Sequence, residues 1–258
     1  MIILIDVGNT NIVVGLHDDN VLLHSWRLWT LRNRTSDELG LMLTQLLETA
    51  HIDVRQIQDI AIACVVPPLM LALKEMSIKY FKCTPFMIEP GIKTGIPIVY
   101  DNPKEVGADR IVNAVAAFKE YGAPSVVIDF GTATTFDVIS EKGEYIGGVI
   151  APGIIISSEA LFQYAARLPR VEIADPKCVI GKNTVTAMQS GIFYGYIGLV
   201  DEIAKRIVNE LKKDCKFIAT GGLAELVAPY CSYNPTIDLD LTLKGIKLLY
   251  ELNRPKNE

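Results

Sequence analysis

Two similar stretches of sequence decide the fold prediction: Ile2-Ile-Leu-Ile-Asp6-Val-Gly8-Asn-Thr10 and Val126-Val-Ile-Asp129-Phe-Gly131-Thr132. In each, a short apolar run is followed by Asp-x-Gly and then by hydroxyl or amide side chains. Two further β-rich stretches follow each copy, at 11–16 and 22–29 in the first half and at 134–140 and 145–150 in the second. A strand unit that recurs at the midpoint of the chain indicates an internal duplication.

Helical patterns alternate with these strands. Thr35 and Glu38 form a capping-box pattern, and apolar residues at helical spacing follow them. Further helices are predicted from about 109 and at 69–81, 157–168, 183–213 and 241–253, and buried strands at 61–66 and 217–220. Strands that alternate with helices predict α/β layers, here in two domains, residues 1–118 and residues 119–258.

Composition narrows the class of protein. The 258 residues are half hydrophobic, with a formal net charge of −5 and no basic block, so we expect neither nucleic acid nor an anionic membrane as a partner. The longest apolar run, 61–73, is too short to span a bilayer and is broken by Pro67 and Pro68. The N-terminus reads as a strand and not as a signal peptide, and the five scattered cysteines form no CxxC pair. We therefore expect a cytoplasmic protein with reduced, mostly buried thiols.

Phosphate chemistry is predicted at the first copy of the repeat, Asp6-Val7-Gly8-Asn9-Thr10-Asn11. The glycine lets the backbone turn tightly after the strand and brings main-chain N–H groups close to a ligand. The asparagine and threonine side chains add donors at the same edge. The aspartate can hold Mg²⁺, usually through water, and the metal then neutralises the phosphates. An ordinary hairpin turn is the alternative for one copy, and the second copy favours a phosphate site.

The second copy is richer in hydroxyl groups, because Thr132, Thr134 and Thr135 follow Gly131. Two such hairpins fit a nucleotide clamped between two half-domains. A further glycine pair, in Thr220-Gly221-Gly222, closes a buried strand and would let a flat adenine lie against the backbone; a plain helix-starting turn is the alternative. The sequence contains no P-loop, no GxGxxG and no protein-kinase motif set.

The charged sequence Gly107-Ala108-Asp109-Arg110 precedes an apolar helical face. One interpretation is that Asp109 only caps that helix, which is a common use of aspartate. The other is that Asp109 is a general base that takes a proton from an alcohol during phosphoryl transfer. Arg110 would then hold an anionic group of the substrate, since a guanidinium binds a carboxylate with two parallel hydrogen bonds.

These motifs, in this order and spacing, resemble those of the type III pantothenate kinases. The resemblance spans nearly the whole chain and includes Val65-Val-Pro-Pro68, Gly147-Gly148 and Ala151-Pro-Gly153. It is the combination of Gly107–Arg110 with the long Asp129 motif that is specific to this family. Either motif alone would indicate only the wider superfamily of actin, Hsp70 and sugar kinases.

The resemblance implies two ribonuclease-H-like halves with the nucleotide in the cleft between them. It implies ATP-dependent phosphorylation of pantothenate at its primary hydroxyl to 4'-phosphopantothenate, the first step toward coenzyme A, with Asp109 as catalytic base. Tyr100 and Gly107–Arg110 would line the pantothenate pocket. Asp6–Thr10 and Thr132 would hold Mg²⁺ and the ATP phosphates, and Asp129 would accompany a bound K⁺ or NH₄⁺.

The resemblance also implies a homodimer, because Thr184 matches a position that reaches pantothenate from the partner subunit. Gly191, Gly195 and Gly198 form a stripe on the helix predicted at 183–213, which suggests either tight internal packing or a dimer interface. Two rival functions remain at this point. One is another small-molecule kinase of the same superfamily, and the other is a non-catalytic accessory or regulatory relative.

Overall fold

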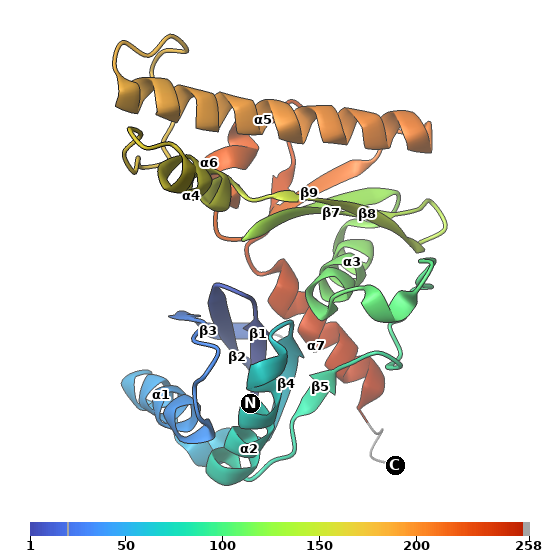
Figure 1. Ribbon diagram of the computed structural model, residues 1–258. Coiled ribbons are helices and arrows are strands. Elements are labelled where there is room, and N and C mark those ends of the chain that lie inside the picture. The colour runs from blue at the N-terminus through green and yellow to red at the C-terminus, as the bar shows by residue number, and fades with distance from the viewer. Residues whose placement is uncertain (20, 255–258) are drawn as a thin grey trace. The chain divides into compact units, whose positions relative to one another are not determined.

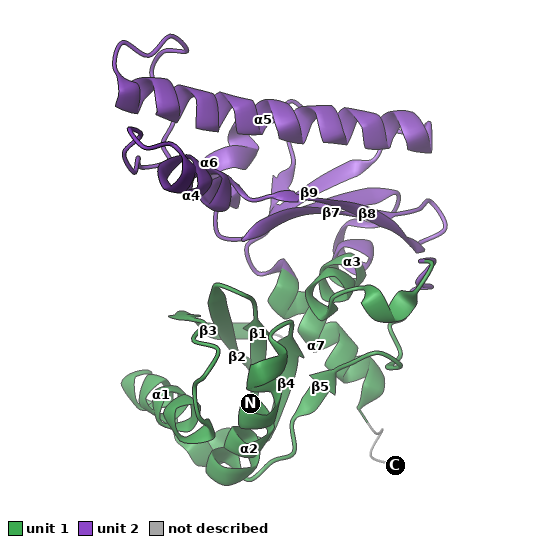
Figure 2. Ribbon diagram, viewed as in Figure 1, with its two compact units in different colours: residues 1–95, 101–116, 242–258 green, residues 96–100, 117–241 purple. Residues whose placement is uncertain are grey.

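The computed structural model describes residues 1–19 and 21–254 (Figure 1). The chain divides into two compact units, and each is described by itself (Figure 2). Unit 1 contains Met1–Gly95, Asp101–Ala116 and the chain from Thr242 onward. Unit 2 contains Ile96–Tyr100 and Ala117–Leu241.

The sheet of unit 1 has the order β3-β2-β1-β4-β5. β2 runs antiparallel to both β1 and β3, and β4 and β5 continue the sheet in parallel with β1. The strands are β1 (Ile2–Val7), β2 (Asn11–Asp18), β3 (Val21–Trp29), β4 (Asp59–Cys64) and β5 (Phe86–Ile88).

The sheet of unit 2 repeats this topology with the order β10-β9-β6-β7-β8. Again three antiparallel strands are joined by two parallel ones. Asp6 is the fifth residue of β1 and Asp129 the fifth of β6, so the two acids occupy equivalent places. The predicted duplication is therefore confirmed at the level of strand order and direction. The strands are β6 (Ser125–Phe130), β7 (Ala133–Ile139), β8 (Tyr145–Pro152), β9 (Lys216–Thr220) and β10 (Thr236–Ile237).

Helices pack on both faces of the unit 1 sheet. Ile3, Ile5 and Val7 of β1 share one core cluster with apolar residues of α1 (Ser36–Thr49) and α2 (Met70–Phe81). Since side chains alternate along a strand, Leu4 faces the other side. On that side α7 (Leu241–Asn253) approaches Gly15, the residue paired with Leu4, and also packs against the first part of α3 (Ala108–Tyr121).

The close packing of α7 on α3 depends on Gly245. A Cβ at that position would lie 2.1 Å from the carbonyl oxygen of Val112. This contact joins the last helix to unit 1, whereas the sequence predicts a single division after residue 118. A contact between residues so far apart in the chain leaves no local pattern, so the sequence cannot indicate it.

In unit 2 the long helix α5 (Thr184–Leu211) packs on the sheet together with α4 (Ile154–Tyr164) and the short α6 (Ala224–Val227). The predicted α5 is confirmed almost to the residue, with Asn183 as its N-cap. The helix predicted at 157–168 instead begins at Ile154, because Gly153 serves as its N-cap, and it ends at Tyr164.

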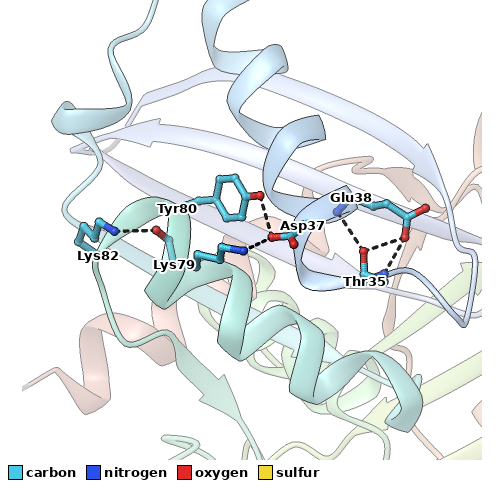
Figure 3. A network of polar contacts seen from close by, with 6 residues as sticks. All are labelled: Thr35, Asp37, Glu38, Lys79, Tyr80 and Lys82. Carbon is cyan, nitrogen blue, oxygen red and sulfur yellow. Dashed lines mark hydrogen bonds and ion pairs between the residues drawn. The ribbon is translucent and has the colours of Figure 1, made fainter.

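The predicted capping box of α1 is confirmed (Figure 3). The Thr35 hydroxyl accepts a hydrogen bond from the Glu38 backbone N–H at 3.2 Å, and the Glu38 carboxylate accepts one from the Thr35 N–H at 2.8 Å. In the same turn Asp37 accepts hydrogen bonds from Lys79 and Tyr80 of α2, which links the two helices at the surface. No helix in the described part of the chain is long and apolar enough to cross a membrane.

The five cysteines are free thiols, as the sequence predicts, but they are less buried than expected. Cys231 is buried, Cys178 is exposed, and the other three are intermediate. Burial raises the pKa of the Cys231 thiol to about 12, so that thiol stays protonated at neutral pH.

Candidate active site

The hairpin between β1 and β2 contains the predicted phosphate residues of unit 1. The Gly8 N–H donates to the Asn11 carbonyl at 3.0 Å, which closes the turn. Asn9 is exposed at its tip, and Asp6, Thr10 and Asn11 are partly exposed. The side chain of Val7 is fully buried in the core, so this residue can offer a ligand only its main chain.

A threonine that the sequence reasoning missed fixes this hairpin. Thr30, the residue after β3, donates through its hydroxyl to the Gly8 carbonyl at 2.7 Å. Its N–H also donates to the Thr10 carbonyl at 2.9 Å. Thr30 follows a strand with no Asp-x-Gly or glycine pair beside it, so no local pattern marks it.

The second predicted part of unit 1 is the start of α3. Gly107 precedes the helix, Ala108 is its first residue, and the Asp109 carboxylate accepts a hydrogen bond from the Arg110 N–H at 2.8 Å. Asp109 thus satisfies one helix-terminal N–H while it remains partly exposed. The structural and the catalytic interpretation of this residue are compatible.

Gly107 leaves the space that the carboxylate needs. A Cβ at Gly107 would lie 2.5 Å from Asp109 Oδ1 and 3.8 Å from the Val65 side chain. Val65 follows β4, and its N–H donates to the Val7 carbonyl at the end of β1. Val65 therefore connects the Asp6–Asn11 hairpin with the start of α3, so unit 1 brings these two predicted groups together.

Burial raises the pKa of Asp109 above its usual value, because the charged carboxylate loses solvation. The hydrogen bond from the Arg110 N–H and the positive charge of Arg110 lower it by less. Arg110 itself is only 8% exposed. A desolvated carboxylate next to a buried guanidinium is a better proton acceptor than an ordinary surface aspartate.

In unit 2 the ends of β6 and β9 bring Asp129 next to the Thr220–Gly222 turn. Asp129 and Thr220 are partners in the register of the two strands. Gly221 has φ of +92°, and a Cβ there would lie 2.4 Å from Asp129 Oδ1. Glycine is therefore required both by the backbone conformation and by the carboxylate above it. The Thr220 side chain is buried, so this residue offers no exposed hydroxyl.

The three threonines of the second hairpin differ in their roles. Thr132 is exposed at the turn, where its carbonyl accepts a hydrogen bond from the Gly153 N–H at 3.1 Å. Thr134 is buried and is hydrogen-bonded to the Tyr196 hydroxyl of α5. Thr135 donates to Asp137 at 3.0 Å. Of the three, only Thr132 is exposed, so the three hydroxyls do not form the predicted cluster.

Tyr100 belongs to the short Ile96–Tyr100 segment of unit 2 and lies against β8. Two backbone hydrogen bonds join this segment to Tyr145. The Val99 N–H donates to the Tyr145 carbonyl at 2.8 Å, and the Tyr145 N–H donates to the Pro97 carbonyl at 2.9 Å. The rings of Tyr100 and Tyr145 have centroids 6.3 Å apart. Tyr145 is itself fixed by a hydrogen bond from its hydroxyl to the buried Asp137.

Thr184, the first residue of α5, lines a mostly apolar groove of about 750 Å³ between α4 and α5. Gly191 and Gly195 line the same groove, and no atom lies within 4 Å of a Cβ built at either position or at Gly198. The glycine stripe therefore does not serve close packing against another helix of its own unit. The other lining residues are mainly aliphatic: Ile154, Leu161, Leu168, Met188, Ile192 and Leu199.

The candidates for metal binding are single carboxylate side chains and not clusters of metal-ligating residues. Among residues 1–19 and 21–254 there is no group of three or more His, Cys, Asp or Glu side chains that could hold a metal ion. Mg²⁺ in phosphoryl-transfer sites is usually held by one or two carboxylates, with phosphate oxygens and water as its other ligands. Asp6, at the edge of the sheet beside the hairpin, fits that mode.

Sequence comparison gives the family. A profile of the type III pantothenate kinases matches residues 2–206. A type III pantothenate kinase from Halalkalibacterium halodurans is 54% identical over 253 residues, which cover 98% of this chain and all of the relative. One from Geobacter sulfurreducens is 52% identical over 254 residues, with the same coverage.

Comparison of structures gives the fold. MreB 5 of Spiroplasma citri, solved with AMPPNP, aligns with a TM-score of 0.56 at 11% identity over 97% of this chain and 96% of that one. The activator of 2-hydroxyisocaproyl-CoA dehydratase from Clostridium difficile, solved with ADPNP, aligns with a TM-score of 0.53 at 10% identity over 96% and 94%. The two α/β units thus have the fold of the actin, Hsp70 and sugar-kinase superfamily. Together with the sequence match, this shows that the chain belongs to the type III pantothenate kinase family.

Proposed function

We propose that this chain transfers the γ-phosphoryl group of ATP to the primary hydroxyl of pantothenate, giving 4'-phosphopantothenate for coenzyme A synthesis. The observation that supports this most strongly is the family match over nearly the full chain, combined with an acid of raised pKa at the start of α3. The reaction would take place in the cytoplasm, where ATP is available.

Asp109 is the general base in this proposal. Its carboxylate accepts the hydroxyl proton of pantothenate as the phosphoryl group is transferred. Gly107 leaves the carboxylate room to face the substrate, and the Arg110 N–H holds its orientation. The buried Arg110 guanidinium binds the carboxylate of pantothenate, and Tyr100 lines the same pocket.

The ATP phosphates are bound by main-chain and side-chain donors of the Asp6–Asn11 hairpin and by Thr132. Mg²⁺, when bound through Asp6, supplies charge neutralisation on the phosphates. Gly221 and Gly222 accommodate the adenine. Asp129 is the residue for a monovalent cation, K⁺ or NH₄⁺, next to the phosphates. In this loose type of transfer the protein contributes mainly positioning and charge neutralisation.

The active enzyme is a homodimer in this proposal. The open, apolar groove along α4 and α5 and the exposed stripe of glycines on α5 support it, because a partner helix can approach glycines closely. Thr184, at the end of the same groove, would then reach the pantothenate site of the partner subunit.

The test is a coupled assay of ADP formation with and without pantothenate, run in K⁺ and again in Na⁺. We expect turnover only with pantothenate and a higher rate in K⁺. Two other alcohols, a hexose and N-acetylglucosamine, serve as controls. Turnover that is independent of pantothenate, or that prefers a sugar, would contradict the proposal.

A further inference from the structure

A loop of unit 1 outside the predicted site residues lies against the phosphate hairpin. It begins at Thr30, immediately after β3. Thr30 contributes two hydrogen bonds, one to the Gly8 carbonyl at 2.7 Å and one to the Thr10 carbonyl at 2.9 Å. These bonds fix the start of the loop against both sides of the turn. The residues that follow Thr30 are therefore held near the hairpin.

Two residues further on, Arg32 contacts the hairpin directly. Its Nη2 donates to Asn9 Oδ1 at 3.4 Å, and both side chains are exposed. A guanidinium carries only donors, so it can bind only the oxygen of the asparagine amide. The amide nitrogen of Asn9 thereby remains available as a donor, which is the kind of group that binds an anion.

The charge of Arg32 is not committed to a carboxylate. Four other exposed arginines of the described chain pair with an acidic side chain: Arg55 with Asp53, Arg170 with Glu159, Arg206 with Glu202 and Arg254 with Asp59. Within the part of the chain that the structure describes, the contact with Asn9 is the only hydrogen bond or ion pair of Arg32. Four of the five N–H groups of its guanidinium thus remain for a ligand.

We propose that Arg32 binds a phosphate group of the nucleotide at the Gly8–Asn11 hairpin and orients the Asn9 amide toward the same group. This inference rests on the proposed nucleotide site. A planar guanidinium is suited to phosphate because it can donate two parallel hydrogen bonds to its oxygens. Pantothenate also carries an anionic group, but the contact of Arg32 with Asn9 places it at the phosphate turn.

Three variants at Arg32 separate charge from hydrogen bonding. Arg32→Ala removes both. Arg32→Gln keeps a donor for Asn9 without the charge, and Arg32→Lys keeps the charge without the paired N–H donors of the guanidinium. We expect Arg32→Ala to raise KM for ATP about tenfold, the size of one lost charge-assisted hydrogen bond, with kcat and KM for pantothenate within about twofold. Arg32→Lys should recover part of the loss, and Arg32→Gln less.

The matched control is Arg55→Ala, which removes the same charge from unit 1. Arg55 lies before β4, and β4 runs parallel to β1, so Arg55 is at the opposite end of the sheet from the hairpin. The KM for ATP of the Arg55→Ala variant should equal that of the wild type. As ionic strength rises, KM for ATP should increase more steeply in the wild type than in Arg32→Ala.

Binding of a non-hydrolysable ATP analogue, measured by calorimetry without pantothenate, separates this inference from the proposed function. Weaker analogue binding by Arg32→Ala supports the role of Arg32 whatever the acceptor substrate is. Unchanged affinity and unchanged KM for ATP would overturn it. A change confined to KM for pantothenate would also overturn it, because Arg32 would then bind the acceptor.

Discussion

At Asp109, burial and helix position act in opposite directions on one carboxylate. Burial raises its pKa, whereas the Arg110 N–H and the Arg110 charge lower it by less, so the pKa remains above the ordinary value of 3.8. A base with a raised pKa accepts a proton more readily, provided that it is still ionised at the working pH.

This shift predicts the pH dependence of the reaction. We expect kcat/KM for pantothenate to fall on the acid side with an apparent pKa above 3.8, as Asp109 becomes protonated. The measurement is a pH profile of kcat/KM between about pH 4 and pH 8, checked against the known acid stability of the coupling enzymes. An acid limb at or below 3.8 would contradict the role of Asp109 as base.

The same shift has a consequence for stability with a defined sign. A carboxyl whose folded pKa is raised binds its proton more tightly in the folded state, so its contribution to stability falls as pH rises from below 3.8 to above the raised value. At pH 7 the ionised Asp109 therefore costs stability, and Asp109→Asn should unfold at the same or a higher urea concentration than the wild type. Asp53 is the opposite case, because its hydrogen bond from Arg55 lowers its pKa to about 2. The ionised Asp53 therefore does not cost stability at pH 7, and Asp53→Asn should not stabilise the chain. A clear loss of stability in Asp109→Asn would show that the carboxylate has a structural role.

Gly221 allows a second prediction about a single residue. Its φ of +92° and the Asp129 oxygen, 2.4 Å from where a Cβ would lie, both oppose a side chain. Gly91 is a matched control, because it has φ of +103° and no atom within 4 Å of a built Cβ. Urea unfolding should show a loss of about 1–2 kcal/mol for Gly91→Ala, from the backbone alone. Gly221→Ala should lose more and should also lose activity as Asp129 moves. Equal losses in the two variants would show that the Asp129 contact is unimportant.

Among the helices, α1 shows how a local sequence signal becomes stability. Thr35→Ala removes the hydroxyl that accepts the Glu38 N–H and should cost about 1 kcal/mol in urea unfolding. Thr49→Ala is the control, because its hydroxyl donates only to the Gln45 carbonyl at the other end of the same helix. The capping account would be wrong if the two alanine variants lost equal stability.

The elements that the sequence predicts well are those specified by neighbouring residues. The capping box, the N-terminus of α5 and the two Asp-x-Gly hairpins each depend on a few consecutive side chains. What the sequence does not reveal depends on distant partners. Thr134 is withdrawn from the candidate site by Tyr196, 62 residues away, and Thr30 reaches Gly8 across 22 residues. Spacing alone cannot distinguish a hydroxyl that faces a ligand from one that bonds another helix.

At the scale of the whole molecule, one strand plan is used twice. The two five-stranded sheets have the same order and directions, and Asp6 and Asp129 occupy the same place in each. The surrounding residues have diverged, since the start of α3, in unit 1, contributes Asp109 and α5 of unit 2 contributes the open groove. Duplication thus explains the fold, and the differences between the copies account for the proposed division of roles.

The groove leads to a prediction about assembly. A Cβ at Gly195 meets nothing within 4 Å beyond the neighbouring backbone of its own helix, so Gly195→Glu should fold, yet it places a charge in the proposed dimer interface. Light scattering should show a dimer for the wild type and a monomer for this variant, with loss of activity because Thr184 no longer reaches the partner's site. Asn209→Glu, on an exposed position near the end of the same helix, should remain a dimer. A Gly195→Glu protein that is still dimeric would place the interface elsewhere.

In the proposed reaction this chain phosphorylates pantothenate with Asp109 as the base. The most direct measurement follows transfer of labelled γ-phosphate from ATP to pantothenate by mass spectrometry, in the wild type and in Asp109→Asn, with nucleotide affinity measured on the same samples. We predict 4'-phosphopantothenate from the wild type, and a rate reduced at least about a hundredfold in the variant with nucleotide affinity unchanged. Undiminished transfer by Asp109→Asn, or no labelled pantothenate product from the wild type, would contradict the account.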